Sequence, residues 1–318
     1  MSNINLPIII KKFDNHLGKI IQEDLKILKD IKRYIIKSGG KRIRPLTHYF
    51  ITQLLNYKGK DWLDIGSISE LIHAASLLHD DVVDNSELRR GSPTIGKLYG
   101  NKVAILAGDY LLACGIEHLN KFQNPRLMDS FTKVIRDLAV GELLQMEWEK
   151  NPSISRVEYN KIIYGKTASL FGAVSETAGI LAKADEKKIQ ELKNFGVSLG
   201  MMFQVKDDYI DYFQEEKKTG KTRMKDFLNG LYTYPLIRLK ELASKKEVKE
   251  IDFIISKPSR NQEDIHKTLE LTQKYSTQKE ILNELKDFAY QLKTFLNQFP
   301  KSQYRNLMLE RIEQLVES

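Results

Sequence analysis

The sequence predicts an all-α protein, built as a single domain of antiparallel helices packed into a bundle. Apolar residues recur at the three- and four-residue spacing of an amphipathic helix through most of the 318 residues. No long run of alternating Val, Ile and Thr bounded by hairpin turns is present, so a sheet is not expected. Segments between the periodic stretches are short, and short connections join helices that pack antiparallel. We therefore expect one domain over residues 1–318.

Prolines and glycines divide this pattern into separate helices. The chain has eight prolines, most of them where a helix is expected to stop, and none between Pro152 and Pro235. Pro45 lies early in a predicted helix that follows the glycine turn Gly39-Gly40, a favoured position for proline. The predicted helices cover residues 5–37, 43–56, 62–85, 94–98, 101–121, 125–149, 156–183, 187–214, 226–244, 246–256, 262–275, 278–298 and 301–317.

Two parts of the chain are predicted to differ from the rest: one is a mobile loop, and the other lacks functional residues. The stretch 214–233 is polar, contains Gly220 and Gly230, and follows an acidic cluster, so we expect a mobile loop beside a site. From about residue 243 onward the charge rises and no chemical motif is found. That region is predicted to be scaffold.

Composition favours a soluble globular protein of the cytoplasm. Hydrophobic residues make up 42% and charged residues 29% of the chain, which argues against disorder. The one cysteine, Cys114, offers neither a disulfide framework nor a zinc site. The first residues have charges after the apolar run rather than before it, unlike a signal peptide. The apolar stretch VAILAGDYLLACGI is interrupted by Asp109 and is too short to span a bilayer.

The net charge of +8 leaves three classes of anionic partner open: nucleic acid, a membrane surface and an anionic substrate. No zinc finger, RNP-type aromatic motif or basic zipper is present, and the lysines are scattered over many helices. Nucleic acid is therefore not an expected partner.

Two clusters with the pattern Asp-Asp-x-x-Asp lie on predicted apolar helices. Aspartates at positions i and i+4 share a helix face, and charged groups in apolar surroundings need a counter-charge or a metal. Carboxylate oxygens suit Mg2+, which takes its other ligands from water and substrate phosphates. A solvated acidic face is the alternative, but apolar residues flank both clusters. If the two sets face each other, they can clamp a diphosphate through metal ions. The clusters are Asp80, Asp81 and Asp84, and Asp207, Asp208 and Asp211.

Basic residues stand near the first cluster and could hold the remaining phosphate charge. Arg89 and Arg90 follow it directly, and Lys41 and Arg44 lie in the glycine turn GGKRIRP, whose backbone N–H groups could bind an anion. His73 lies two helical turns before Asp80 on the same face. The alternative for the segment GGKRIRP is a basic turn exposed to solvent. The alternative for His73 is a core histidine with a satisfied hydrogen bond.

These residues fall in blocks that resemble the trans-polyprenyl diphosphate synthases. The resemblance extends over roughly residues 35–240, with the blocks in order and at compatible spacing. AILAGDYLLA and GELLQ, which contain Asp109, Glu142 and Gln145, look like further family blocks. The blocks that carry the resemblance are GGKRIRP, HAASLLHDDVVDNSELRRGSPT, GKTASLF and FQVKDDYIDY.

The resemblance implies the isoprenoid synthase fold, an all-α bundle around a deep central cavity, and condensation of isopentenyl diphosphate with an allylic diphosphate. Three Mg2+ per active site are implied, bound by Asp80, Asp81, Asp84, Asp207, Asp208 and Asp211. A catalytic role is implied for these aspartates and for Lys166. Isopentenyl diphosphate is implied to bind Lys41, Arg44, His73 and Arg90, and the allylic diphosphate Arg89, Lys166, Thr167, Gln204 and Lys221.

Two features bear on the product. Family members with short products carry an aromatic residue at the fourth or fifth position before the first aspartate, whereas Ser76 and Ala75 are small here. The tunnel is therefore expected to admit a hexaprenyl to octaprenyl chain, of the kind used for quinone side chains. Leu231 stands where the family often has lysine, a replacement that recurs in long-chain, two-component members.

Several alternatives remain open on sequence alone. A short-chain geranylgeranyl or farnesyl diphosphate synthase is the nearest, and a non-catalytic partner subunit or prenyl-diphosphate carrier belongs to a different class. A terpene cyclase usually lacks the second aspartate motif found at Asp207–Asp211. The expected assembly is a homodimer, or a heterodimer with a small regulatory subunit. Association with the inner membrane surface is also expected, because the product is hydrophobic.

Overall fold

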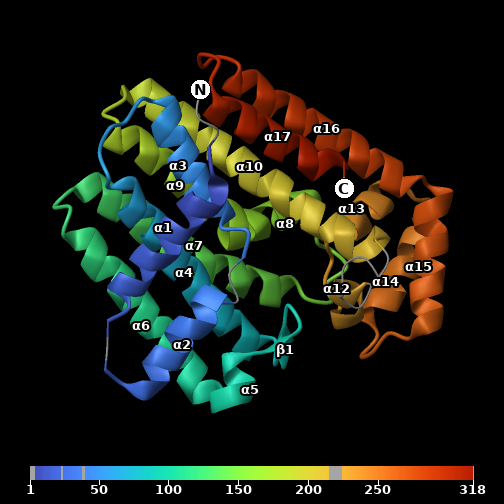
Figure 1. Cartoon of the computed structure of the whole chain (residues 1–318). Coiled ribbons are helices and arrows are strands. Elements are labelled where there is room, and N and C mark those ends of the chain that lie inside the picture. The colour runs from blue at the N-terminus through green and yellow to red at the C-terminus, as the bar shows by residue number, and fades with distance from the viewer. Residues whose placement is uncertain (1–3, 23, 38–39, 215–223, 318) are drawn as a thin grey trace. The chain divides into compact units, whose positions relative to one another are not determined.

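The computed structural model describes residues 4–22, 24–37, 40–214 and 224–317. Nearly all of this described chain is helical, so the all-α prediction is confirmed (Figure 1). The helices are α1 (Leu6–Ile20), α2 (Lys26–Lys37), α3 (Ile43–Leu54), α4 (Trp62–Val83), α5 (Ile95–Tyr99), α6 (Asn101–Asn120), α7 (Pro125–Trp148), α8 (Arg156–Ile163), the π-helix η1 (Tyr164–Ala168), α9 (Ser169–Leu181), α10 (Glu186–Phe213), α12 (Lys225–Asn229), α13 (Tyr234–Leu242), α14 (Lys245–Ser256), α15 (Gln262–Lys274), α16 (Thr277–Leu296) and α17 (Gln303–Glu317).

The chain groups into two compact units, each formed from separate stretches of sequence. Unit 1 comprises Met1–Ile135, Leu170–Gly196 and Phe299–Met308, and unit 2 comprises Arg136–Ser169, Val197–Gln298 and Leu309–Ser318. The single domain expected from the sequence stays a prediction.

Helix α4 forms the centre of unit 1. Helices α1, α3, α5 and α6 pack against it, so apolar residues on several of its faces are enclosed (Figure 1). Ile65, Ile68 and Leu71 are fully buried there. A helix that is apolar all round is expected inside a bundle rather than at its surface. Replacing Leu71 by Ala would cost about 2–5 kcal/mol of stability through the cavity it leaves.

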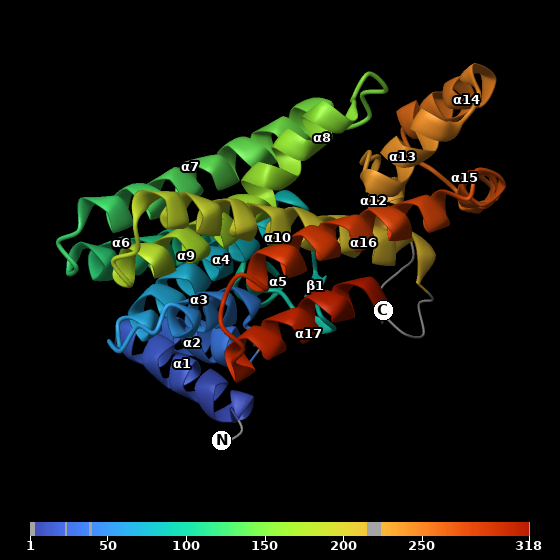
Figure 2. The same ribbon diagram turned by 90° about the horizontal axis from the view of Figure 1, so that it is seen from above.

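Unit 2 is organised around α13, which packs against α8, α15 and α16 (Figure 2). Close backbone packing also joins α7 to the π-helix η1. A Cβ atom on Gly141 would lie 2.7 Å from the backbone nitrogen of Lys166, and one on Gly165 would lie 2.5 Å from the carbonyl oxygen of Asp137. Only glycine at both positions permits this approach.

Three predicted helices are interrupted in the structure. The segment 5–37 divides into α1 and α2, and the freed carbonyl of Ile21 accepts a hydrogen bond from Lys32 Nζ at 3.1 Å. The segment 156–183 contains the five-residue π-helix η1. The segment 226–244 breaks at Gly230, whose φ of 87° ends α12 in the left-handed region. Periodicity alone did not reveal these breaks because apolar residues continue through them.

One short hairpin is the only strand structure among the described residues, in agreement with the all-α prediction. Strand β1 (Leu88–Arg89) pairs antiparallel with β2 (Ser92–Pro93). The two turn residues, Arg90 and Gly91, both have positive φ, at 51° and 76°. This is the conformation that tight two-residue hairpins require. Strands of two residues are too short to give an alternating sequence pattern.

The predicted loop at 214–233 is only partly loop. Residues 225–229 within it form α12, and part of the remainder, including Lys221, lies outside the described residues. Among the described residues, no helix combines the length and the apolar character needed to cross a bilayer.

Candidate active site

The first acidic motif lies at the C-terminal end of α4, in unit 1. Asp80 is half-buried and Asp84 is exposed. Asp81 is different, because it is 4% exposed and its Oδ1 accepts a hydrogen bond from Arg89 Nε at 2.8 Å. The hairpin supplies this arginine, so β1 fixes the middle aspartate of the motif. Asp80 and Asp84 are left as the more accessible carboxylates.

A basic group gathers in the same unit. The Arg44 guanidinium lies over the Phe171 ring, with 4.9 Å between its central carbon and the ring centroid. Burial lowers the pKa of Arg44 to about 10, and Arg90 adds to the lowering while Glu70 opposes it. Burial also lowers the pKa of His73 well below its usual range, and the positive charges of Arg44 and Arg90 lower it further. The imidazole of His73 is therefore neutral near pH 7.

One atom of this basic group is left without a partner. The Nε of Arg44 is buried and has no hydrogen-bond acceptor among the described residues. An unpaired buried donor on a charged group costs about 1–3 kcal/mol or more. The unpaired donor belongs to a guanidinium, a group that binds phosphate oxygens.

The glycine turn packs against this group. A Cβ atom at position 40 would lie 2.8 Å from Arg90 Nη1, so Gly40 makes room for that guanidinium. Lys41 is exposed. Arg42, by contrast, is buried in ion pairs of 2.8 Å with Asp14 and 2.5 Å with Glu70. Arg42 therefore anchors the turn to the core.

The second acidic motif lies on α10, in unit 2. Asp207 is exposed, whereas Asp208 is 3% exposed. The carboxylate of Asp211 accepts hydrogen bonds from the backbone N–H groups of Lys225 at 3.2 Å and Asp226 at 3.4 Å. These N–H groups lie at the start of α12, so Asp211 ties α10 to that helix.

The carboxylate of Asp208 is surrounded by donors. Tyr159 donates its hydroxyl to Oδ2 at 2.7 Å, Tyr234 donates its backbone N–H at 3.1 Å, and Gln204 donates Nε2 to Oδ1 at 2.9 Å. Thr167 in turn donates to Gln204 Oε1 at 2.7 Å. Burial and the neighbouring Asp226 nevertheless raise the pKa of Asp208 above its usual range.

Lys166 comes from the π-helix. Its Nζ lies 2.7 Å from Glu142 Oε1 and 2.8 Å from Gln145 Oε1, both on α7. A π-turn inserts an extra residue into a helix and is frequent at functional sites. Here it coincides with the close approach of Gly141 and Gly165 and places the lysine against α7.

The structure brings together some of the residues predicted to bind substrates and metal. In unit 1, Arg44, His73, Arg90 and Gly40 lie close together, and in unit 2 the same holds for Thr167, Gln204 and Asp208. Neither acidic motif has three carboxylates whose oxygens converge within 4.8 Å among the described residues. Tyr159 and Tyr234 were not predicted as site residues. No spacing signal marks them, because their contacts with Asp208 span 49 and 26 residues of sequence.

The two proposed chain-length positions differ in accessibility. Ala75 is fully buried in a hydrophobic cluster that includes Leu71, Leu78 and Leu111. Ser76 is half-buried, and its hydroxyl donates to the carbonyl of His73 at 2.9 Å. Ser76 is therefore the more exposed of the two side chains.

Comparison with known proteins gives the family. The polyprenyl synthetase family model matches residues 25–272. An octaprenyl diphosphate synthase from Escherichia coli (strain K12) is 33% identical over 217 residues, which cover 68% of this chain and 67% of that protein. A geranylgeranyl diphosphate synthase from Saccharolobus solfataricus is 30% identical over 277 residues, covering 85% and 83%.

A solved structure of similar fold is that of a polyprenyl synthase from Caulobacter crescentus CB15 complexed with calcium and isoprenyl diphosphate. It has a TM-score of 0.90 and 29% identity, and the match covers 98% of this chain and 95% of that one. The fold is thus the isoprenoid synthase fold. With the family model matching most of its length, the chain belongs to the polyprenyl synthetase family of prenyltransferases.

Proposed function

We propose that this chain condenses isopentenyl diphosphate with an allylic diphosphate in trans and builds a long all-trans polyprenyl diphosphate for quinone side chains. The observation that carries the proposal is the unpaired, buried Nε of Arg44, whose guanidinium forms a basic group with Arg90 beside the neutral His73, in the same unit as Asp80. Such a group favours binding of a diphosphate over binding of a neutral ligand.

We propose Mg2+ as the cofactor, with three ions per active site. Oxygen donors suit this hard cation, and the accessible carboxylates of Asp80, Asp84 and Asp207, with Asp211, would hold it. Asp81 and Asp208 are proposed as ligands that the protein also positions, because Arg89 donates to Oδ1 of Asp81 and Tyr159 donates to Oδ2 of Asp208. Bound Mg2+ would neutralise charge on the leaving diphosphate.

The substrates are proposed to divide between the two basic sets. Lys41, Arg44, His73 and Arg90 would bind isopentenyl diphosphate. The allylic diphosphate would contact Arg89, Lys166, Thr167, Gln204 and Lys221, the last outside the described residues. The solved polyprenyl synthase from Caulobacter crescentus, which holds an isoprenyl diphosphate, supports a diphosphate as ligand.

The proposed chemistry follows from the charges around the diphosphate. Positive groups stabilise negative charge on the leaving diphosphate, so the allylic C–O bond breaks to give a carbocation. The double bond of isopentenyl diphosphate attacks the cation, and loss of a proton restores an alkene. By resemblance, the departing diphosphate takes the proton. Apolar helix walls would keep water from the cation.

Product length is the finer part of the proposal. Ser76 is small at a position where a bulky residue would block the chain, which supports a hexaprenyl to octaprenyl product. The similarity to an octaprenyl diphosphate synthase also supports it. A short-chain product is the second candidate, and the similarity to a geranylgeranyl diphosphate synthase favours it.

Incubation of the purified chain with Mg2+, isopentenyl diphosphate and farnesyl diphosphate tests the proposal, with the products sized by chromatography after dephosphorylation. A ladder ending at hexaprenyl to octaprenyl is expected. A product that stops at geranylgeranyl would establish the short-chain alternative. If only a mixture with a second chain from the same cell were active, the protein would be one half of a two-component enzyme.

We further propose that the active unit is a homodimer in the cytoplasm, which can also work at the inner membrane surface. Exposed apolar side chains on α6 support an interface between copies. Leu106 is 66%, Ile105 43% and Ile116 40% exposed. Exposed apolar side chains that gather on a surface commonly mark a contact site, and we propose Ile105, Leu106 and Ile116 as residues of one.

A further inference from the structure

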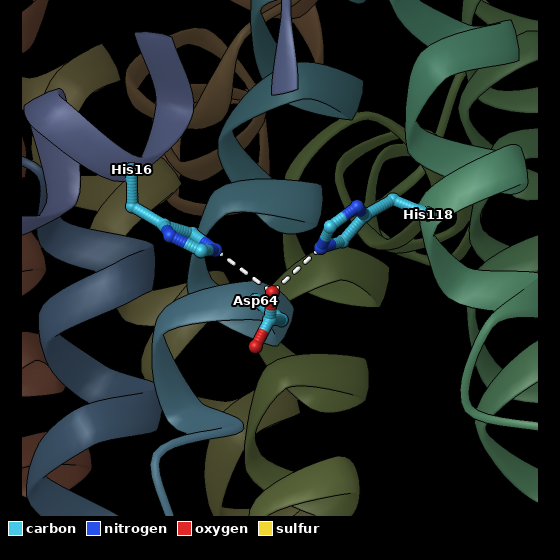
Figure 3. Close-up of side chains that lie close together, drawn as sticks. All are labelled: His16, Asp64 and His118. Carbon is cyan, nitrogen blue, oxygen red and sulfur yellow. Dashed lines mark hydrogen bonds and ion pairs between the residues drawn. The ribbon is translucent and has the colours of Figure 1, made fainter. Parts of the chain in front are cut away.

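Two histidines and an aspartate from three helices of unit 1 meet in a small cluster (Figure 3). His16 comes from α1, Asp64 from α4 and His118 from α6. The Nε2 atoms of His16 and His118 lie 2.8 Å and 2.6 Å from the same oxygen, Oδ1 of Asp64. Among the described residues, this is the one group of three potential ligands whose atoms all lie within 4.8 Å of one another.

The two imidazoles approach the carboxylate from different sides. Their rings are nearly perpendicular, at 75° with 6.0 Å between centroids, so both Nε2 atoms can point to one spot without stacking (Figure 3). The side chains of His16, Asp64 and His118 are 26%, 24% and 18% exposed. The cluster is thus held by the fold and partly exposed to solvent, from which a water ligand can come.

The carboxylate is held in its charged form. Burial alone would raise the pKa of Asp64, but the hydrogen bonds from His16 and His118 outweigh it, and the pKa is lowered. An ionised carboxylate is the form that binds a metal.

This donor set has a definite metal preference. Two imidazole nitrogens and one carboxylate oxygen suit borderline ions such as Zn2+ and Co2+, whereas Mg2+ prefers oxygen donors only. Ligand atoms around a tetrahedral Zn2+ lie about 3.4 Å apart, given bond lengths of about 2.0–2.2 Å. The present 2.6 Å and 2.8 Å separations would need to widen by less than about 1 Å, a shift that side-chain rotation can supply.

We propose that His16, Asp64 and His118 bind a divalent transition ion of the Zn2+ class, which fastens the N-terminal helix α1 to α4 and α6. A solvent molecule would complete the four ligands. The single cysteine excludes a cysteine-based zinc site but not one built from two histidines and an aspartate, and no motif marks these three residues because they lie 48 and 54 positions apart. The site does not depend on prenyl transfer, because Asp64 precedes Asp80 by sixteen residues of the same helix, about 24 Å along its axis.

The competing explanation is a metal-free hydrogen-bond triad. In that arrangement each Nε2 carries a hydrogen and donates to Asp64. Glutamine separates the two explanations, since its Nε2 amide can donate to Asp64 but offers no imidazole lone pair to a metal. His16→Gln and His118→Gln therefore preserve the triad's hydrogen bonding and remove one metal ligand each.

The experiment uses the full chain, stripped with EDTA and then held in excess Mg2+ so that the aspartate motifs are occupied. Co2+ is added and its visible absorption recorded, and Zn2+ is added while the Tm is followed. The wild-type chain should bind one Co2+ with the spectrum of a four-coordinate ion, and saturating Zn2+ should raise its Tm by roughly 3 °C or more.

Variants decide the assignment. His16→Gln and His118→Gln should each weaken Co2+ binding at least tenfold and abolish the Zn2+-dependent rise in Tm, with little change in Tm in EDTA. His266→Ala, which removes an exposed histidine of α15, is the matched control and should bind as the wild type does. Wild-type Co2+ affinity in both glutamine variants, or no Zn2+ effect on the wild-type Tm, would overturn the proposal.

Discussion

Tyr159 donates its phenolic hydrogen to Oδ2 of Asp208 across 2.7 Å, and both side chains are only 3% exposed. The bond joins α8 to α10 inside unit 2. Because Asp208 also accepts from Gln204 and from the backbone of Tyr234, the middle aspartate of the second motif is held by the protein itself. The first motif has the same arrangement, because its middle aspartate, Asp81, accepts a hydrogen bond from Arg89.

Tyr159→Phe should lower the free energy of unfolding by about 1 kcal/mol, since one of three donors to Asp208 is lost. Asp208→Ala should cost about 3 kcal/mol, because the donors of Tyr159, Gln204 and Tyr234 are then left buried without an acceptor. Urea unfolding at pH 7 measures both values. Equal losses in the two variants would contradict the network described here.

Asp80→Ala and Asp207→Ala should each reduce turnover by orders of magnitude at saturating Mg2+ while leaving the Tm nearly unchanged. Both carboxylates are accessible and are proposed to hold Mg2+, so their loss removes charge stabilisation of the leaving diphosphate. Asp129→Ala, at an exposed position on α7, is the control and should keep full activity. Wild-type rates in both site variants would refute the metal assignment.

Stability should decrease as the pH falls from about 6.5 toward 4. His48 is fully buried, and burial lowers its pKa to about 4, although the hydrogen bond with the Val174 carbonyl opposes this. The unfolded chain binds a proton at this histidine near pH 6.5, so it holds more protons than the folded chain in that interval. Each pH unit then costs about 1.4 kcal/mol, and the whole interval about 3 kcal/mol.

The lowered pKa of His73 acts in the same direction. The wild-type chain should therefore lose more free energy of unfolding, as the pH falls, than His48 alone accounts for. His48→Asn can still donate to Val174 but cannot titrate, and it should lose less stability between pH 7 and pH 5 than the wild type. Urea midpoints at the two pH values test this. Identical losses would show that His48 is protonated in the folded chain.

Ser76→Phe should shorten the products of the proposed reaction. An aromatic ring at this half-buried position would occupy space one helical turn before Asp80, and one turn, about 5.4 Å, corresponds to about one isoprene unit. Chromatographic sizing of dephosphorylated products measures the shift. Ala75→Phe is expected instead to destabilise the core by about 1–3 kcal/mol, because Ala75 is fully enclosed. An unchanged ladder in Ser76→Phe would place the length control elsewhere.

Leu106→Lys should convert the proposed dimer into monomers. A lysine in place of Leu106, the most exposed apolar side chain of α6, would place a charge in the proposed interface, where an unpaired charge costs several kcal/mol. Light scattering during gel filtration gives the mass directly. Phe253→Lys is the matched control, since Phe253 is 67% exposed and lies on α14, not on α6. A wild-type mass for the Leu106 variant would exclude this surface.

Much of the helical layout was predictable because helices leave a local signature. Boundaries of α3, α6 and α7 agree with the prediction to within two residues. The misses have two origins: contacts between residues distant in sequence, and an element too short to give a pattern. Gly141 against Gly165 accompanies the π-turn, and the Arg90-Gly91 turn is too brief to leave a pattern.

The sequence by itself determined the helical class, the positions of the six aspartates and the family resemblance, because each depends on residues close together in the chain. Only the tertiary structure decided which aspartates are accessible. Burial and hydrogen bonds from Arg89 and Tyr159 single out Asp81 and Asp208 as held residues, although all three positions of a motif carry the same chemical group. The tertiary structure alone also brought His16, Asp64 and His118 within reach of one ion, since packing, not sequence spacing, sets the distance between three helices.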